Sequence, residues 1–290
     1  MSLPNDTRMG AVCLRVRDGQ AEADFYEGRL GLRVLRDESG RSLDVTSADG
    51  ELLVRLQVDP QASPRPRHTT GLYHFALLVP DRAGLGVTLA TLLERGYPLQ
   101  GAADHLVSEA VYLADPEGNG IEIYRDRPRE EWPRPGGQIA MATDPLDAEG
   151  VLAEGRSSGS DRGMPPGTRM GHVHLNVADL GAAEAFYCGL LGFDLVTRYG
   201  GSASFVSAGG YHHHVGMNTW AGPGASPPPE GSQGLVYSTV LLPTPEALSK
   251  VESRLEEAQV DSQELDGGVL VRDPSHNGVL LRADGDGRRA

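Results

Sequence analysis

The sequence predicts an α+β fold in which four βαβββ modules pair into two curved, cup-like mixed sheets. Two observations support this prediction: the two halves of the chain repeat one another, and a second pair of repeats fills the remaining sequence. Short repeats of this kind are single supersecondary units, which bury their apolar faces only by packing against each other. Pairs of modules are therefore expected to share a sheet.

The first pair of repeats opens the two halves of the chain. The segment from Met9 to Val16 reads MGAVCLRV, the segment from Met170 to Val177 reads MGHVHLNV, and each leads into Phe-Tyr and then Leu-Gly. The first copy carries Ala11 where the second carries His172. Because the fold needs no histidine at this position, His172 indicates a function.

The second pair of repeats lies after each copy of the first. The segment Gly71–Pro80 aligns with Gly234–Pro243, and Asp115–Glu122 aligns with Asp273–Leu280. The chain is thus a series of modules of roughly 50 to 60 residues. The modules, numbered one to four, begin near Met9, Gly71, Met170 and Gly234.

Each module has the same predicted order of elements. Its first strand shows alternating apolar residues, as at Val173, Leu175 and Val177. A helix capped by an acidic residue follows; Asp81 caps the one in module two, which ends near Gly96. Three further strands complete the module, and a tight turn joins the last two.

The modules define an N-terminal half over residues 1–126 and a C-terminal half over residues 169–290, with a linker at residues 127–168. Two pairings of modules are open. In the pairing that we favour, modules two and three share one sheet and modules one and four share the other. The alternative pairs module one with two and module three with four.

Composition narrows the class of protein. The net charge of −14 argues against a nucleic-acid partner. The sequence contains no apolar run long enough to span a membrane, and its start lacks the pattern of a secretion signal. Two cysteines make no disulfide scaffold, so we expect a reducing, cytoplasmic location.

Side chains that can bind a metal occur at two aligned positions of the repeat. The first-strand positions that align are Ala11, His74, His172 and Tyr237. The last-strand positions, counted four residues past the turn glycine or its equivalent, are Val54, Glu122, His214 and Leu280. All side chains of metal-ligand type therefore belong to modules two and three.

If modules two and three face one cleft, His74, Glu122, His172 and His214 converge on a divalent metal. Imidazole and carboxylate suit Fe(II), Mn(II), Zn(II) and Ni(II). A buried carboxylate such as Glu122 is costly unless a cation compensates it. His212 is the alternative to His214, because strand alternation would place both on one face.

At these residues the chain resembles the vicinal oxygen chelate superfamily. That superfamily includes glyoxalase I, bleomycin- and fosfomycin-resistance proteins and extradiol ring-cleaving dioxygenases; the chain is most similar to its four-module, catechol-2,3-dioxygenase-like subgroup. The resemblance covers nearly the whole chain. Its main motifs are at His172–Val177, Ala182–Tyr187, Gly71–Phe75 and Tyr112–Tyr124.

The resemblance implies a glyoxalase-type fold and a divalent metal, first of all Fe(II) or Mn(II), held by His74, His172 and Glu122. In ring-cleaving relatives a tyrosine ten residues before the glutamate contacts the substrate hydroxyl, and Tyr112 has that spacing from Glu122. His105 is a candidate acid or base, or a partner near the metal.

The function that we expect is a metal-dependent, extradiol-type ring-cleaving dioxygenase acting on a small catecholic substrate. A fourth ligand at His214 does not suit it, because a catecholate and O2 need three open positions on an octahedral ion. The alternatives are a glyoxalase-type metal-dependent lyase or isomerase and a non-catalytic protein that sequesters a small molecule such as an antibiotic. A monomer and a homodimer are both compatible with the modules. Trp132 and Trp220 are expected to pack.

Overall fold

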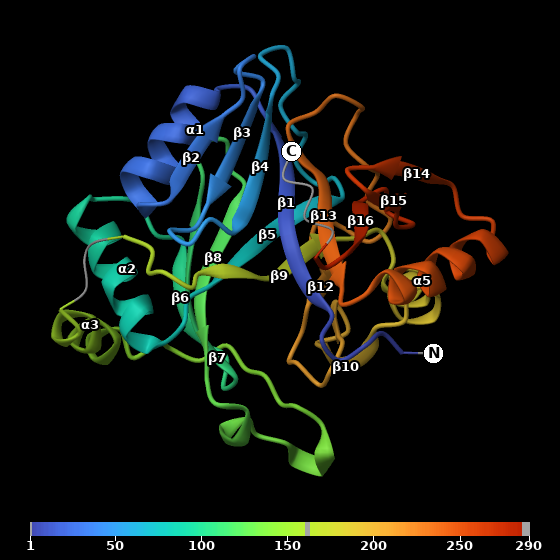
Figure 1. Cartoon of the computed structure of the whole chain (residues 1–290). Helices are drawn as coiled ribbons and strands as arrows, with labels where there is room; N and C mark the ends of the chain where they lie inside the picture. Colours follow the sequence, from blue (N-terminus) through green and yellow to red (C-terminus); the bar gives the residue numbers. More distant parts are fainter. Residues whose placement is uncertain (1, 160–162, 286–290) are drawn as a thin grey trace. The chain divides into compact units, whose positions relative to one another are not determined.

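The computed structural model describes residues 2–159 and 163–285, and its elements follow the predicted module order four times (Figure 1). Module one has β1 (Arg8–Val16), α1 (Gly19–Phe25), β2 (Arg33–Arg36), β3 (Ser42–Thr46) and β4 (Leu52–Val58). Module two has β5 (Gly71–Leu78), α2 (Arg82–Glu94), β6 (Gly101–Asp104), β7 (Ser108–Ala114) and β8 (Gly120–Asp126).

The second half repeats this order. Module three has β9 (Arg169–Asn176), α4 (Leu180–Glu184), β10 (Asp194–Tyr199), β11 (Ala203–Ser207) and β12 (Val215–Asn218). Module four has β13 (Gly234–Leu242), α5 (Pro245–Glu257), β14 (Ser262–Leu265), β15 (Gly268–Arg272) and β16 (Gly278–Ala283). In modules one and three the helix continues into a π-helical turn, η1 (Tyr26–Leu30) and η4 (Ala185–Leu191).

The strands form two eight-stranded mixed sheets, which confirms the predicted fold class. The strand orders are β14-β15-β16-β13-β1-β4-β3-β2 and β10-β11-β12-β9-β5-β8-β7-β6. These orders match the favoured pairing, modules one with four and two with three. In modules two, three and four the first strand runs parallel to the last strand, and the other strand pairs within each of these modules are antiparallel.

The chain divides into two compact units. Unit 1 comprises residues 1–13, 63–73 and 172–290, and unit 2 comprises residues 14–62 and 74–171. In unit 2, Ala76, Leu78, Ala110 and Tyr124 form an apolar cluster on β5, β7 and β8. In unit 1, Cys13, Tyr237 and Leu280 form another.

Side-chain caps start the helices as the sequence predicts, with one exception. Asp18, Asp81 and Asp179 accept hydrogen bonds from backbone amides at the starts of α1, α2 and α4. In α5 the cap is Thr244, followed by a proline, because a hydroxyl can replace a carboxylate at this position. No helix among the described residues is long and apolar enough to cross a membrane.

The linker contains a helix, α3 (Ala148–Ser157), that packs against α2 (Figure 1). At the contact, a Cβ on Gly86 would collide with the backbone of Val151 and Gly155. Arg82 on α2 reaches Asp147 at 2.9 Å and Glu154 at 2.5 Å. Two glycines therefore allow the backbones to touch, and a forked arginine holds the linker helix in place.

We expect Gly86→Ala to lower the free energy of unfolding by about 2 kcal/mol or more, as overpacked contacts do. Helix propensity alone predicts the opposite, a gain of up to about 1 kcal/mol. Urea unfolding of Gly86→Ala beside Gly28→Ala, where an added Cβ meets nothing within 4 Å, would measure the difference. A stabilised Gly86→Ala protein would show that the helices do not touch here.

Candidate metal centre

Two residues of unit 2 bring a histidine and a carboxylate together. On the parallel strands β5 and β8, Ala76 pairs with Glu122. Side chains two apart on a strand share a face, so His74 and Glu122 lie side by side. Nε2 of His74 is 3.1 Å from Oε2 of Glu122, and the two residues are only 7% and 3% exposed.

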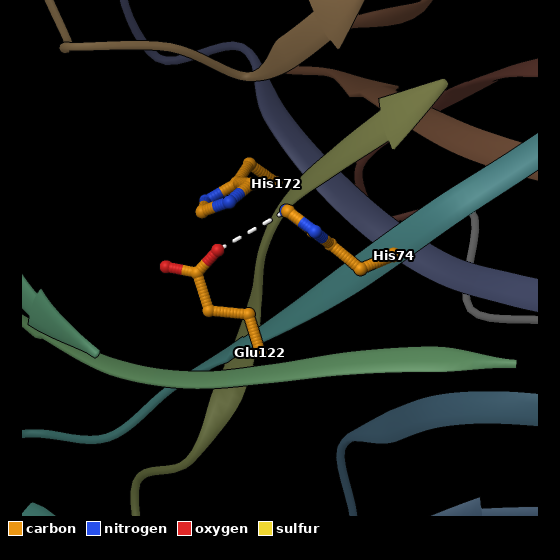
Figure 2. A group of neighbouring side chains, drawn as sticks. All are labelled: His74, Glu122 and His172. Carbon is orange, nitrogen blue, oxygen red and sulfur yellow. Dashed lines mark ion pairs between the residues drawn. The ribbon is translucent and has the colours of Figure 1, made fainter. Parts of the chain in front are cut away.

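His172 of β9 is the third member of the group. Figure 2 shows the three side chains, and one ligand atom from each of His74, Glu122 and His172 lies within 4.8 Å of the others. All three are buried. Within residues 2–159 and 163–285, this is the one set of three or more histidine, cysteine or carboxylate side chains with such spacing. Two imidazoles and one carboxylate are a donor set typical of Fe(II), Mn(II), Zn(II) and related divalent ions.

His214 is not in this group, and strand register explains why. In module two, Glu122 pairs with the residue two beyond His74. In module three, the residue two beyond His172 is His174, and it pairs with Gly216. The position equivalent to Glu122 is therefore Gly216. Counting four residues past the turn glycine gave His214, two residues before Gly216. The count fails because the loop before β12 in module three is longer than the corresponding turn in module two.

His212 does not replace His214, because the triplet precedes the strand. β12 begins only at Val215, so the expected alternation does not apply to the histidines. Nδ1 of His214 accepts a hydrogen bond from the Ala208 amide at 3.1 Å, and its ring packs on Tyr211. His213, which alternation would turn away, packs against His172 with ring centroids 4.1 Å apart.

Tyr112 stands beside Glu122, and His105 stands beside Tyr112. Tyr112 on β7 is the direct cross-strand partner of Glu122 on β8, and its ring centroid is 5.7 Å from that of His74. Its hydroxyl lies 2.6 Å from Nε2 of His105, whose Nδ1 lies 2.7 Å from the carbonyl of Ala142. A carbonyl only accepts, so Nδ1 carries the hydrogen and Nε2 accepts from the Tyr112 hydroxyl.

A strained turn positions His105. It lies in the connection between β6 and β7, where Leu106 has φ of 68°. A non-glycine residue with positive φ costs energy and is common at functional sites. The Asp104 carboxylate accepts from the Leu106 amide at 2.8 Å, and the backbones of Asp104 and Asp144 pair. The linker residues 142–144 thus hold the turn that carries His105.

In module four, the positions equivalent to His74 and Glu122 belong to an apolar cluster. Tyr237 and Leu280 pack with Cys13 in the apolar cluster of unit 1. Thr239, two residues beyond Tyr237, pairs with Leu280, so the register counted from the sequence is correct in this module. The repeat thus uses these positions for packing in module four and for buried polar side chains in module two.

The sequence interpretation missed three residues beside His172. His174 follows it on the same face of β9, Gly216 lies opposite His174, and His213 packs on the ring of His172. Alternation along β9 could have identified His174. No local signal identifies Gly216 or His213, because both depend on the length of the loop before β12.

The comparisons with known proteins agree with the fold and the motifs. The chain matches the model of the "Glyoxalase/Bleomycin resistance protein/Dioxygenase superfamily" over residues 8–123 and 169–280. Two solved structures show the same fold: one from Bacillus subtilis (TM-score 0.67, 13% identity, covering 98% of this chain and 87% of that one) and glyoxalase I from Zea mays (TM-score 0.57, 15% identity, covering 95% and 92%).

A curated relative is much more similar in sequence. "Catechol-2,3-dioxygenase" of Bacillus subtilis (strain 168) is 45% identical over 278 residues, covering 94% of this chain and 96% of the relative. The match therefore includes all four modules and the linker. Together with the family match, this similarity establishes that the chain belongs to the glyoxalase/bleomycin resistance protein/dioxygenase superfamily and is a dioxygenase-type enzyme of that superfamily.

Proposed function

We propose that this protein is a metal-dependent extradiol dioxygenase that opens the ring of a small catechol, with His74, Glu122 and His172 as metal ligands. The observation that carries the proposal is the buried group of two imidazoles and one carboxylate. The catechol-2,3-dioxygenase name of the 45% identical relative supports the substrate class.

The donor set suits a divalent cation. Glu122 is 3% exposed, and its ion pair is with His74, which is charged only when protonated. A buried carboxylate is electrostatically costly unless a cation compensates it, so the burial of Glu122 suits a bound divalent metal. Bound there, Fe(II) or Mn(II) would supply the one-electron chemistry that allows O2 to react with a catecholate.

Gly216 favours ring cleavage over the glyoxalase-type alternative. A glycine at the position equivalent to Glu122 offers no side-chain donor, so module three contributes a single ligand, His172. With three protein ligands, a bound Fe(II) or Mn(II) would have room for both oxygens of a diol and for O2. A fourth ligand at His214 would not suit a ring-cleaving dioxygenase, and His214 is not in the group of three.

Tyr112 and His105 are the residues that we propose to move the proton. The Tyr112 hydroxyl donates to Nε2 of His105 and stands beside Glu122. When Tyr112 accepts a proton from a substrate hydroxyl, its own proton passes to Nε2, and the Ala142 carbonyl stabilises the resulting imidazolium at Nδ1. General base catalysis of this kind contributes roughly 10²- to 10⁴-fold to the rate.

Tyr112→Phe is therefore expected to lower kcat by about 10²-fold while metal content stays at the wild-type level. His105→Ala should give a similar loss, and the double variant should be no worse than either alone, since the two residues act in one relay. Steady-state oxygen uptake with metal analysis of each protein checks this. Additive losses would show that the two side chains act separately.

The proposed function is tested by anaerobic reconstitution with Fe(II) or Mn(II), followed by oxygen uptake on a panel of catechols. We expect uptake matched by a ring-opened product, and loss of both uptake and bound metal in His74→Ala and His172→Ala. Absence of uptake with every catechol would reject the proposal. Turnover without oxygen on Zn(II)- or Ni(II)-loaded protein would instead favour a lyase or isomerase.

A further inference from the structure

We propose that Asp104 is a positioning residue, which holds the turn that carries His105 so that His105 can accept the proton of Tyr112. This inference rests on the proposed function for the relay of Tyr112 and His105. All the residues that carry it belong to unit 2. Asp104 is the last residue of β6. Its Oδ1 accepts from the Leu106 amide at 2.8 Å, and its Oδ2 pairs with the Arg127 guanidinium at 2.5 Å.

The internal repeat shows that this turn is unusual. In the other three modules, the connection between the second and third strands contains a glycine with positive φ, at Gly40, Gly200 and Gly267. In module two the residue with positive φ is Leu106, at 68°. This conformation costs energy for a residue with a Cβ, and it persists only where surrounding contacts hold it. The fold itself does not require a leucine in this conformation, so the contacts that hold it indicate a function.

Arg127 contacts the same turn through its backbone and its side chain. Its amide donates to the Val107 carbonyl at 2.8 Å, and its guanidinium group pairs with Asp104. Arg127 is itself held, because Nε1 of Trp132 donates to its carbonyl at 2.9 Å. Trp132 is buried as the sequence predicts, whereas Trp220, contrary to the prediction, is 47% exposed. Asp104 therefore pairs with an arginine whose backbone is anchored on both sides.

The charge of Asp104 is unfavourable for the sheet. Glu109, which is 1% exposed, lies directly opposite Asp104 on β7, and like charges in this arrangement destabilise a strand pair. Arg127 offsets the repulsion, because its guanidinium is 2.5 Å from Asp104 and 3.4 Å from Glu109. Arg82 and Arg125 also pair with Glu109. An uncharged residue at position 104 would avoid the repulsion, so strand pairing does not account for the acid, whereas its bond to the turn does.

The turn sets the direction of the His105 ring. The His105 amide donates to the Ser108 carbonyl at 2.8 Å. The ring has two partners, the Ala142 carbonyl at Nδ1 and the Tyr112 hydroxyl at Nε2. A change of φ at Leu106 would rotate the backbone of His105 relative to β7, and the ring could no longer meet both partners. Asp104 therefore acts on the relay through His105, without contact to either ring partner.

A double-mutant cycle in the metal-loaded enzyme tests this role. Asp104→Ala is expected to lower kcat for catechol at least about tenfold, while KM and bound metal stay within about twofold of the wild type. In a His105→Ala background the same substitution should change kcat by less than about twofold, because Asp104 acts through His105. A merely structural role would lower kcat equally in both backgrounds.

Two further variants complete the cycle. Asp104→Asn keeps an oxygen for the Leu106 amide, so its kcat should stay within about threefold of the wild type. Asp44→Ala is the matched control, since Asp44 is a carboxylate of similar exposure that pairs with one arginine, Arg55. It should keep the wild-type kcat. An asparagine variant as slow as Asp104→Ala would overturn the inference.

NMR of the metal-free protein gives a readout that needs no turnover. With isotopically labelled histidine at pH 8, His105 should show one tautomer, with its hydrogen on Nδ1, and the signal missing from His105→Gln identifies it. Asp104→Ala should give a mixture of tautomers, and Asp44→Ala should not.

A single, unchanged tautomer in Asp104→Ala would overturn the inference, as would equal losses of kcat in the two backgrounds. If no catechol is cleaved but Asp104→Ala still mixes the tautomers, the proposed function fails and the positioning of His105 stands. If catechols are cleaved and kcat does not depend on Asp104, only the positioning role is rejected.

Discussion

Replacing Gly216 with glutamate is expected to tighten metal binding and to abolish oxygen uptake. A carboxylate at this position would stand to His172 as Glu122 stands to His74, since the two strand pairs have the same register. Metal affinity should rise about tenfold, or about 1.4 kcal/mol. Oxygen uptake should fall at least about 10²-fold, which is a loss of about 2.7 kcal/mol of transition-state stabilisation.

The His174 ring sets the design of this experiment. Any side chain at position 216 meets that ring, so Gly216→Glu is best made alone and together with His174→Ala. Gly216→Gln is the matched control, because it has the same size without the charge. Metal affinity by competition with a chelator and uptake by oxygen electrode give two signals of opposite sign. A glutamate variant that keeps its uptake, or binds metal no better than the glutamine variant, would refute the assignment of Gly216 as the empty ligand position.

A second large effect is expected from Glu22, a buried acid on α1. Glu22 is 0% exposed, and burial, with the charges of Asp115 and Glu117 adding to it, raises its pKa to about 9. Its Oε1 accepts from the Glu117 amide at 3.2 Å, whereas Oε2 has no hydrogen-bond partner among the described residues. The side chain is therefore protonated in the folded protein at neutral pH.

The raised pKa of Glu22 makes stability depend on pH. Above pH 4.5 the unfolded chain releases the proton of Glu22, while the folded chain keeps it until about pH 9. The folded state thus binds one more proton across this window, so the free energy of unfolding falls as pH rises, on the order of 1 kcal/mol per pH unit. Burial also raises the pKa of Asp115, from 3.8 to about 7. Between these two values the free energy of unfolding therefore falls further as pH rises.

Glu22→Gln removes the ionisable group and keeps the shape. Its free energy of unfolding should match the wild type near pH 5 and exceed it by on the order of 3 kcal/mol at pH 8. Urea unfolding at pH 5, 7 and 8 measures this gap, and Glu257→Gln, exposed on α5, controls for net charge. A gap that does not grow with pH would contradict the buried, protonated state. The internal repeat has Ala183 at the equivalent position, so the fold itself does not require this acid.

Much of the fold was predictable because its determinants are local. Alternation along β9, the aspartate caps of α1, α2 and α4 and the repeat itself all act over a few residues. These signals predicted the four modules and the order of their elements. The favoured pairing of modules came from the chemistry of the ligands, since only modules two and three carry them.

The candidate site was predictable where loop lengths are equal. Equal turns in modules two and four made the counted positions Glu122 and Leu280 correct against their partner strands. The longer loop before β12 shifted module three by two residues, from His214 to Gly216. Register is set by backbone pairing across strands. A loop insertion changes that register without any signal in the sequence of the strand itself.

By itself, the sequence determined the repeat and the βαβββ order, and it nominated His74, Glu122, His172 and His214 as candidate metal ligands, because periodicity and side-chain type can be read from the chain. Only the tertiary structure decided that Tyr112 donates to His105, that a glycine takes the fourth position and that His213 packs on His172. Those relations join residues from different strands and loops. Their geometry depends on register, turn conformation and the packing of rings, and spacing along the chain does not encode these.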